Sequence, residues 1–429
     1  MPSSDELKAA LRRRTRQAVG KASRRPQVKK ALVWTGLRSG RANDNEMAGV
    51  PVPARVVAYF GDGPDKLYQL IQWLPVLENL NRVEPVVVVF RKMESFRAAK
   101  KLTTLPRVFI RRFSGLMGLY EGNDFELILY VNNAMSNFQS LEDPRPVHVH
   151  INHGESDKLS MVSNRAKAYD FVFVAGPAAV ERHQARLIDF NLDKLITTGR
   201  PQLDIDFASE LPSSGLRTVM YAPTWEGEND ENNYTSVDVY GVQIVENLLA
   251  LPQTRVIYKP HPRVQGSQEP AMAAAHTRIC ELIEEAGAEH QVLIEGNILA
   301  MFENVDVLVT DISSVGLDFL YLHPEKPLVL TDRRTDPEGR AIDAPISRSC
   351  QVIDETNVGF LGQVLESWFA DAEGVVDRQV ARELYFDGIR RGESTERFLS
   401  QVSFLIEDRR SRLSNYRAWR SADDGGEEV

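Results

Sequence analysis

Short apolar segments alternate with longer segments of helical periodicity through most of the chain, and this alternation constrains its fold more than any other feature. RVVAYFG at 55–61 is typical of a buried strand, and DKLYQLIQWLPVLENL at 65–80 is typical of a helix that follows it. Parallel strands need long crossover connections, and strands covered by helices on both faces are apolar throughout. The alternation therefore predicts an α/β fold with doubly wound parallel sheets.

The strand-like segments form two series, separated by a stretch rich in turn formers at 199–215. The first series continues with PVVVVF (85–90), ELILYV (126–131), VHVHIN (147–152) and FVFVAG (171–176). The second contains TVMYAP (218–223), RVIYKP (255–260), HQVLIEG (290–296), VDVLVT (305–310) and PLVLTD (327–332). A helix is expected over 272–287. Because 429 residues suffice for two such domains, we expect two Rossmann-like domains facing a central cleft.

We place the N-terminal domain at 51–205 and the C-terminal domain at 206–420, with amphipathic helices over 378–418. Residues 1–50 are expected to be a basic, partly disordered segment, and 421–429 an acidic, disordered tail.

Positive charge is concentrated in the first 41 residues of the chain. Residues 1–41 hold twelve Lys and Arg against Asp5 and Glu6, a net of +10, whereas the whole chain carries −9. This segment is either a solvated tail or a contact with an anionic membrane, where each basic residue contributes about 1 kcal/mol. Aromatic residues do not alternate with these charges, so nucleic acid is not expected as a partner.

Several site classes lack their sequence signals. Cys280 and Cys350 are the only cysteines, so neither a disulfide framework nor a zinc site is expected, and a reducing compartment fits best. No GxxxxGK[ST] or HExxH motif occurs, and no apolar run approaches the ~18 residues that span a bilayer. GDGPDK at 61–66 is expected to be a plain turn, and the D-x-D triplet at 204–206 is a weak candidate for a metal site. We expect a cytoplasmic protein, either free or peripheral on the inner face of the cell membrane.

Polar residues follow the strand within VDVLVTDISSVGLDFLYL at 305–322. Asp311, Ser313 and Ser314 stand where this strand ends and a helix begins. Ligands of open α/β sheets bind at the carboxyl ends of strands, and a helix N-terminus suits a phosphate. Both serine hydroxyls can donate to phosphate oxygens, although a plain helix cap has the same sequence.

A cationic loop follows the strand RVIYKP. Lys259 and Arg263 flank His261, and Pro260 and Pro262 stiffen the loop. Such a cluster suits an anionic group that gains charge during a reaction, and a basic surface turn is the alternative.

Two further strand ends carry polar residues. His148 and His150 share one face of the strand at 147–152 and are expected to pack inside the protein, whereas His153 follows the strand end. In YAPTWEG at 221–227, Thr224 and Trp225 can bond and stack with a ligand, or form a simple turn.

Taken together, these stretches resemble the CDP-glycerol glycerophosphotransferase family, the teichoic-acid primases and polymerases of bacterial cell walls. The matching stretches, within about 145–330, are HG (153–154), GRPQLD (199–204), YAPTWEG (221–227), YKPHPR (258–263) and VLVTDISSVGLDFLYL (307–322). The resemblance implies GT-B architecture, with an N-terminal acceptor domain and a C-terminal nucleotide-donor domain.

The resemblance also implies a reaction. A polyol phosphate, glycerol phosphate first, passes from a CDP-alcohol to a hydroxyl of a lipid-linked or polymeric glycan or teichoic-acid acceptor, and CMP leaves. No metal or other cofactor is required. His153 corresponds to the general base and His261 to a group that stabilises phosphate charge. The expected donor and phosphate contacts are Ser313, Ser314, Arg263, Thr224, Lys259, Asp318 and Asp311.

The chain departs from the family pattern at two places. Glu155-Ser156-Asp157-Lys158 follows HG where a Thr-Pro-Leu-Lys-like stretch is usual, which adds negative charge beside the expected base. Arg200 stands where the family usually has Tyr. Three other functions stay open: a GT-B glycosyltransferase using a nucleotide sugar, an isomerase resembling UDP-sugar 2-epimerases, and a non-catalytic, membrane-attached nucleotide-binding subunit.

Overall fold

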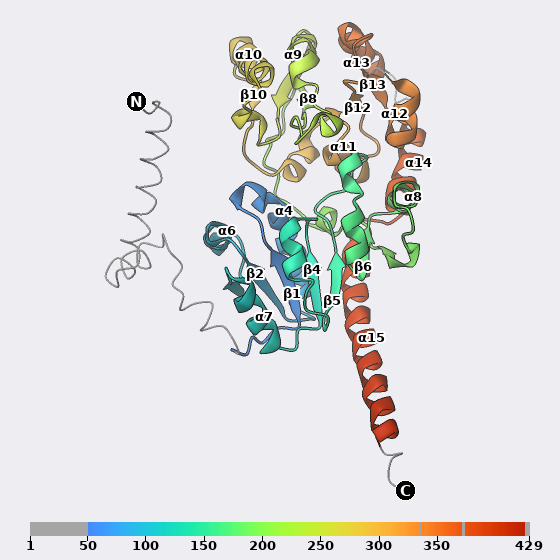
Figure 1. The fold of residues 1–429 in the computed structure, drawn as a ribbon. Helices are drawn as coiled ribbons and strands as arrows, with labels where there is room; N and C mark the ends of the chain where they lie inside the picture. Colours follow the sequence, from blue (N-terminus) through green and yellow to red (C-terminus); the bar gives the residue numbers. More distant parts are fainter. Residues whose placement is uncertain (1–49, 335, 371–373, 425–429) are drawn as a thin grey trace, which may run out of the picture. The chain divides into compact units, whose positions relative to one another are not determined.

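The computed structural model describes residues 50–334, 336–370 and 374–424, and it is an α/β protein with two parallel sheets (Figure 1). This confirms the predicted fold class. The chain divides into two compact units, Met1–Tyr130 with Ala134–Val147, and Val131–Asn133 with His148–Val429. The predicted division at residue 205 stays a prediction, and the basic segment lies, up to residue 49, outside the described residues.

The first sheet has the strand order β3-β2-β1-β4-β5-β6-β7. Its strands are β1 (Val56–Phe60), β2 (Val86–Phe90), β3 (Arg107–Phe109), β4 (Leu127–Tyr130), β5 (Val147–His150), β6 (Phe171–Val174) and β7 (Leu195–Thr197). β1, β2 and β4 are buried along their whole length, as strands covered on both faces must be. The sequence predicted five of these strands and missed β3 and β7, which are three residues long and mostly half-exposed.

Helices connect these strands. They are α4 (Leu67–Ile71), α5 (Leu74–Leu80), α6 (Met93–Ala98), α7 (Phe113–Glu121) and α8 (Pro177–Arg186). The predicted helix at 65–80 is divided into a short 3₁₀ turn, α4 and α5. Pro75 explains the second division, because proline is tolerated in the first turn of a helix and not in its interior.

The second sheet has the order β10-β9-β8-β11-β12-β13. Its strands are β8 (Arg217–Tyr221), β9 (Thr254–Tyr258), β10 (Gln291–Val292), β11 (Val307–Asp311), β12 (Leu328–Thr331) and β13 (Gln351–Ile353). Alternate residues enter two separate cores: Met220 joins one core, and its neighbours Val219 and Tyr221 join the other. The sheet is therefore covered on both faces, as predicted.

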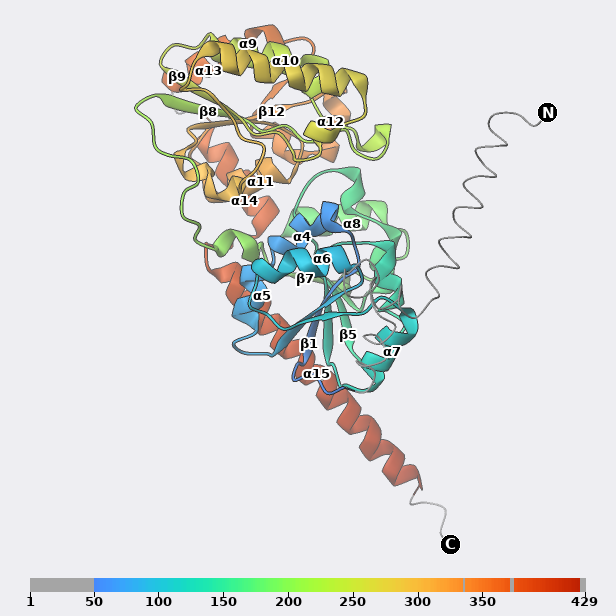
Figure 2. The same ribbon diagram turned by 90° about the vertical axis from the view of Figure 1, so that its left-hand side faces the viewer.

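The helices around the second sheet follow this division (Figure 2). They are α9 (Val242–Leu249), α10 (Pro270–Ala286), α11 (Ser314–Leu322), α12 (Pro337–Asp343), α13 (Leu361–Ala370) and α14 (Val375–Phe386). Buried residues of α9, α10 and α13 pack in one core, and those of α11 and α14 in the other. The predicted helix at 272–287 is confirmed as α10.

The last helix, α15 (Glu393–Asp424), is separated from α14 by a turn that includes Gly388 and Gly392 at positive φ. The Asp204 carboxylate accepts hydrogen bonds from the N–H groups of Gly392 and Thr395, at 2.7 and 2.6 Å. The D-x-D triplet thus holds the start of α15. α15 includes the first four residues of the expected acidic tail, and 425–429 lie outside the described residues.

Two kinds of site are absent from the described residues. None of the helices there combines the length and apolar character needed to cross a membrane. Groups of three or more His, Cys, Asp or Glu arranged to hold a metal ion do not occur within the same residues.

Candidate functional site

A serine hydroxyl at the N-terminus of α11 has no hydrogen-bond partner among residues 50–334, 336–370 and 374–424. Ser313 occupies the N-cap position with extended backbone, yet its side chain makes no capping hydrogen bond. Its Oγ atom is buried and has no hydrogen-bond partner in the part of the chain that the structure describes. An N-cap serine normally accepts from an N–H of the first turn, and these N–H groups have no partner within the helix. The terminus therefore offers a hydroxyl and backbone donors to an anion.

The loop that carries His153 packs against this terminus. A Cβ atom placed on Gly154 would lie 3.3 Å from the Cβ of Ser314. Asn152 turns the chain out of β5 with φ of 50°, and its Oδ1 accepts from the His153 N–H at 2.8 Å. These contacts place the half-buried His153 next to Gly154, the residue that packs against Ser314 at the start of α11.

His261 lies in the loop after β9 as a neutral imidazole. Burial, together with the charges of Lys158, Arg263 and Lys259, lowers its pKa to about 3. Its Nδ1 accepts from the Arg263 N–H at 3.2 Å, so the other ring nitrogen carries the proton and can donate. His153 also lowers the pKa of His261, which places the two predicted histidines within electrostatic range of each other.

Trp225 contacts both His261 and Arg263. Its ring stacks on that of His261, with centroids 6.1 Å apart, and the Arg263 guanidinium lies 4.3 Å from the Trp225 ring centre. The Lys259 ammonium donates instead to the carbonyl of Ile294 at 3.1 Å. Lys259 thus ties the ends of β9 and β10 together, whereas Arg263 is held beside His261 by stacking.

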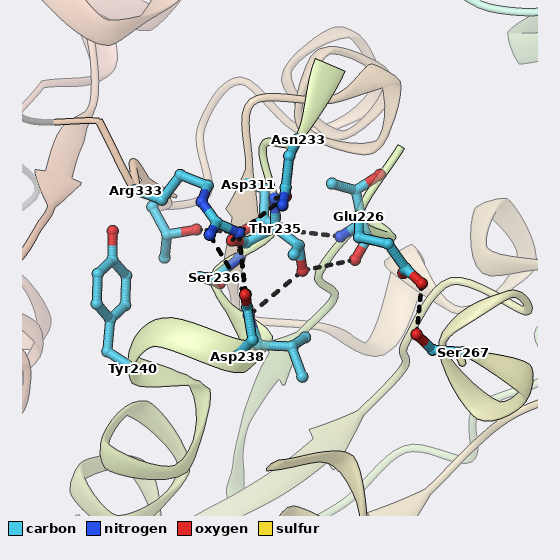
Figure 3. Close-up of polar contacts among 12 residues, drawn as sticks. Glu226, Asn233, Thr235, Ser236, Asp238, Tyr240, Ser267, Asp311 and Arg333 are labelled. Atoms are coloured by element: carbon cyan, nitrogen blue, oxygen red, sulfur yellow. Dashed lines mark hydrogen bonds and ion pairs between the residues drawn. The ribbon is translucent and has the colours of Figure 1, made fainter. Parts of the chain in front are cut away.

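Asp311 organises the loops from inside the sheet (Figure 3). Its carboxylate accepts from the N–H groups of Thr224 and Ser236, at 2.6 and 3.0 Å, and from the Thr331 hydroxyl. Burial raises the pKa of Asp311 to about 6, although these hydrogen bonds lower it. Since both oxygens accept from the protein, Asp311 positions Thr224.

The loop after β8 has further fixed points, which Figure 3 shows as dashed contacts. Arg333 donates to Asn233 Oδ1 at 2.8 Å and pairs with Asp238 at 3.0 Å. Glu226 accepts from the Ser267 hydroxyl. The loop that carries Thr224 and Trp225 is therefore held from three neighbouring segments.

The two acidic residues that follow the HG motif, Glu155 and Asp157, form ion pairs. Arg182 of α8 pairs with Glu155 and, at 2.6 Å, with Asp157, and all three side chains are buried. The Tyr385 hydroxyl of α14 donates to the second Asp157 oxygen. The departure from the family pattern thus forms an internal ion cluster that fixes the loop.

Arg200, the other departure, pairs with Asp318. Their Nη1 and Oδ1 atoms are 2.8 Å apart, and both side chains are buried. Burial raises the pKa of Asp318 to about 6, while Arg200 lowers it. Asp318 lies one helical turn after Ser314, so this pair extends the site along α11.

Lys158 lies among the predicted site residues although no motif assigned it a role. Its ammonium donates to Thr224 Oγ1 at 2.8 Å and lies 5.5 Å from the centre of the Tyr234 ring. The signal was its position four residues after Gly154, where the family pattern also has lysine. A contact across 66 residues of sequence, however, is not visible in a motif.

All nine predicted site residues belong to the second compact unit. Six of them lie on the loops and the helix start described above: His153, His261, Ser313, Ser314, Arg263 and Thr224. Asp318 lies further along α11, and Asp311 and Lys259 form hydrogen bonds within the protein. Their roles in a reaction stay predictions.

Residues 145–333 match the sequence profile of the CDP-glycerol:poly(glycerophosphate) glycerophosphotransferase family. This match confirms the resemblance over the segment that carries the site, and it indicates a transferase of the glycerophosphotransferase type. No curated protein sequence matches the chain.

Solved structures share the fold. The wall teichoic acid polymerase TagF superposes with a TM-score of 0.53 at 13% identity, over 96% of this chain and 100% of that chain. A protein from Listeria monocytogenes assigned as a UDP-N-acetylglucosamine 2-epimerase gives 0.58 at 12%, over 83% and 98%. HepE from Anabaena, in complex with UDP and glucose, gives 0.52 at 10%, over 82% and 99%. The GT-B-like fold is thereby confirmed.

Proposed function

We propose that the protein transfers a polyol phosphate, glycerol phosphate first, from a CDP-alcohol to a hydroxyl of a cell-wall or capsule glycan or teichoic-acid acceptor. The observation that carries the proposal is the packing of Gly154 against Ser314. It places the loop that carries His153 against a helix terminus at which Ser313 Oγ has no hydrogen-bond partner among the described residues. The family match over residues 145–333 supports the same chemistry.

In the proposed reaction the acceptor hydroxyl oxygen attacks the phosphorus that bears the alcohol. A bond forms between them, the bond from that phosphorus to the bridging oxygen breaks, and CMP leaves with the bridging oxygen. The hydroxyl proton passes to His153, the general base. Proton transfer of this kind contributes about 10²–10⁴-fold to a rate.

Charge neutralisation is the second requirement of phosphoryl transfer. In the proposal, the α11 terminus and the hydroxyls of Ser313 and Ser314 bind the diphosphate. Arg263 supplies a cation, and neutral His261 supplies an N–H donor. The proposal needs no metal ion, because these groups supply the positive charge.

The decisive experiment measures CMP release from CDP-glycerol and CDP-ribitol with lipid-linked and polymeric wall acceptors. We expect CMP release that depends on the acceptor and is lost in His153→Ala. The matched control is His276→Ala, a half-buried histidine of α10. Consumption of a UDP- or GDP-sugar without any CDP-alcohol would establish a glycosyltransferase instead, and conversion of a UDP-HexNAc without acceptor would establish an epimerase.

The proposal includes a place of action, the cytoplasmic face of a bacterial membrane, because such acceptors are lipid-linked. Its support is the net charge of +10 in residues 1–41. Sedimentation with anionic vesicles tests it: removal of residues 1–30 should abolish binding, and neutral vesicles should bind neither form. Equal binding of both forms to anionic vesicles would contradict this part.

A further inference from the structure

Lys158 is a cation of the site whose contacts differ from those of the charged residues before it. Glu155 and Asp157 pair with Arg182. The Lys158 ammonium instead donates to a neutral hydroxyl, Thr224 Oγ1, at 2.8 Å. No carboxylate bonds to it among the described residues.

Three loops meet near this ammonium. Its own loop carries His153 and packs on Ser314 through Gly154. The loop after β8 contributes Thr224 and the ring of Tyr234, whose hydroxyl accepts from the Leu159 N–H at 3.2 Å. The loop after β9 contributes His261, whose imidazole lies within range of the Lys158 charge.

We propose that Lys158 is a phosphate ligand of the bound donor: its ammonium contacts the diphosphate and neutralises the charge that CMP gains as it leaves. This inference rests on the proposed function. Lysine acts as a compact charge with three donors, and one of these is spent on Thr224, so two remain for phosphate oxygens. The same hydrogen bond fixes the ammonium and Thr224 relative to each other.

The protonation of Lys158 supports this role. Burial lowers the pKa of its ammonium to about 8, and the nearby Asp311 carboxylate raises it. The other groups that face Lys158 are Tyr234 and His261, and His261 is neutral. The free enzyme therefore loses this cation as pH rises through about 8, and a bound diphosphate restores it by raising the pKa.

Binding of three probes tests the inference: CDP-glycerol, CMP and cytidine. In Lys158→Met we expect CDP-glycerol and CMP to bind about 10- to 100-fold more weakly, since a hydrogen bond to a charged group is lost, and cytidine to bind unchanged. Lys167→Met, which removes an exposed lysine of the same unit, should bind all three as wild type does. Equal loss for cytidine would indicate a structural role, and unchanged binding of CDP-glycerol would refute the inference.

A pH profile separates a charge effect from a packing effect. In wild type, kcat/KM should fall above about pH 8. Lys158→Arg, which keeps the charge, should retain activity at pH 9 relative to its own value at pH 7. The same alkaline limb in both proteins would overturn the inference. If the wild-type protein neither binds nor consumes a CDP-alcohol, the proposed function itself fails. If the wild-type protein is active and Lys158→Met is equally active, only the inference about Lys158 fails.

Discussion

Gly154 and Ser314, 160 residues apart in sequence, are packed so closely that a Cβ on the glycine would lie 3.3 Å from that of the serine. Few protein contacts at Cβ are this tight. The contact joins the loop of His153, the expected base, to the expected phosphate site at the start of α11. The distance between His153 and this site therefore depends on Gly154, which has no side chain.

Gly154→Ala should therefore impair the reaction more than the fold. The added methyl group must displace either Ser314 or the loop by a few tenths of an ångström, and a displacement of reacting groups lowers the rate. We expect kcat/KM for CDP-glycerol to fall about 10-fold or more, and Gly154→Val to be worse. Gly215→Ala, which has nothing within 4 Å of its Cβ position, is the control. Wild-type kinetics in Gly154→Val would contradict the close packing.

Ser313→Ala should lower the affinity for CMP while leaving the stability of the protein nearly unchanged. The Ser313 hydroxyl makes no capping bond, so its removal should change the free energy of unfolding by less than about 0.5 kcal/mol. Affinity for CMP should fall about 10-fold, because the hydroxyl no longer donates to phosphate. Asp336→Ala provides the opposite case, since Asp336 Oδ1 accepts from the Gly339 N–H at 2.9 Å and caps α12. That variant should lose about 1 kcal/mol and bind CMP normally. Denaturation curves and calorimetry measure both quantities.

Arg182→Met should destabilise the protein strongly. It leaves Glu155 and Asp157 buried without their cation, and breaking a buried pair costs about 3–5 kcal/mol. Arg186→Met, one turn later in α8, removes a pair with the half-exposed Asp343 and should cost at most about 1 kcal/mol. Chemical denaturation at pH 7.5 compares the two. Equal costs would mean that the ion cluster does not hold the loop.

Asp318 should give the protein a measurable pH dependence. Its pKa is about 6 in the folded protein against an ordinary value of 3.8, so the folded state holds this proton more tightly than the unfolded chain. Ionisation of Asp318 therefore lowers stability. Relative to Asp318→Asn, wild type should lose about 3 kcal/mol as pH rises from about 4 to 6, and the difference should stay constant above pH 7.

Denaturation of both proteins at pH 4.5, 5.5, 6.5 and 7.5 measures this difference. Asp189→Asn, which makes the same substitution at an exposed position, serves as the control. A difference that rises with pH would show that the Arg200 charge, and not burial, determines the ionisation of Asp318.

Local sequence predicted those parts of the fold that have a local cause. The long apolar strands, such as Val86–Phe90 and Val307–Asp311, were found because burial on both faces requires continuous apolar residues. The short edge strands Leu195–Thr197 and Gln351–Ile353 were missed, because half-exposed strands of three residues have no such pattern.

The site divides in the same way. Motifs after β9 and β11 predicted that His261 and Ser313 lie at one edge of the second sheet, because parallel strands bring their carboxyl ends together. His153 was predicted from its place after β5 of the first sheet, and the roles of all three stay predictions. The contacts of Lys158 with Thr224, and of Arg182 with two carboxylates, depend on folding across many residues and have no local signal.

The hydrogen bond from Tyr385 to Asp157 joins two segments that the ribosome makes at different times, because they are 228 residues apart. A chain emerging from the ribosome exposes His153 long before α14 exists, and until then Asp157 lacks one of its two partners. The loop gains this contact only after residue 385 has been added. A chain that stops before α14 would thus carry His153 on a loop that lacks this contact.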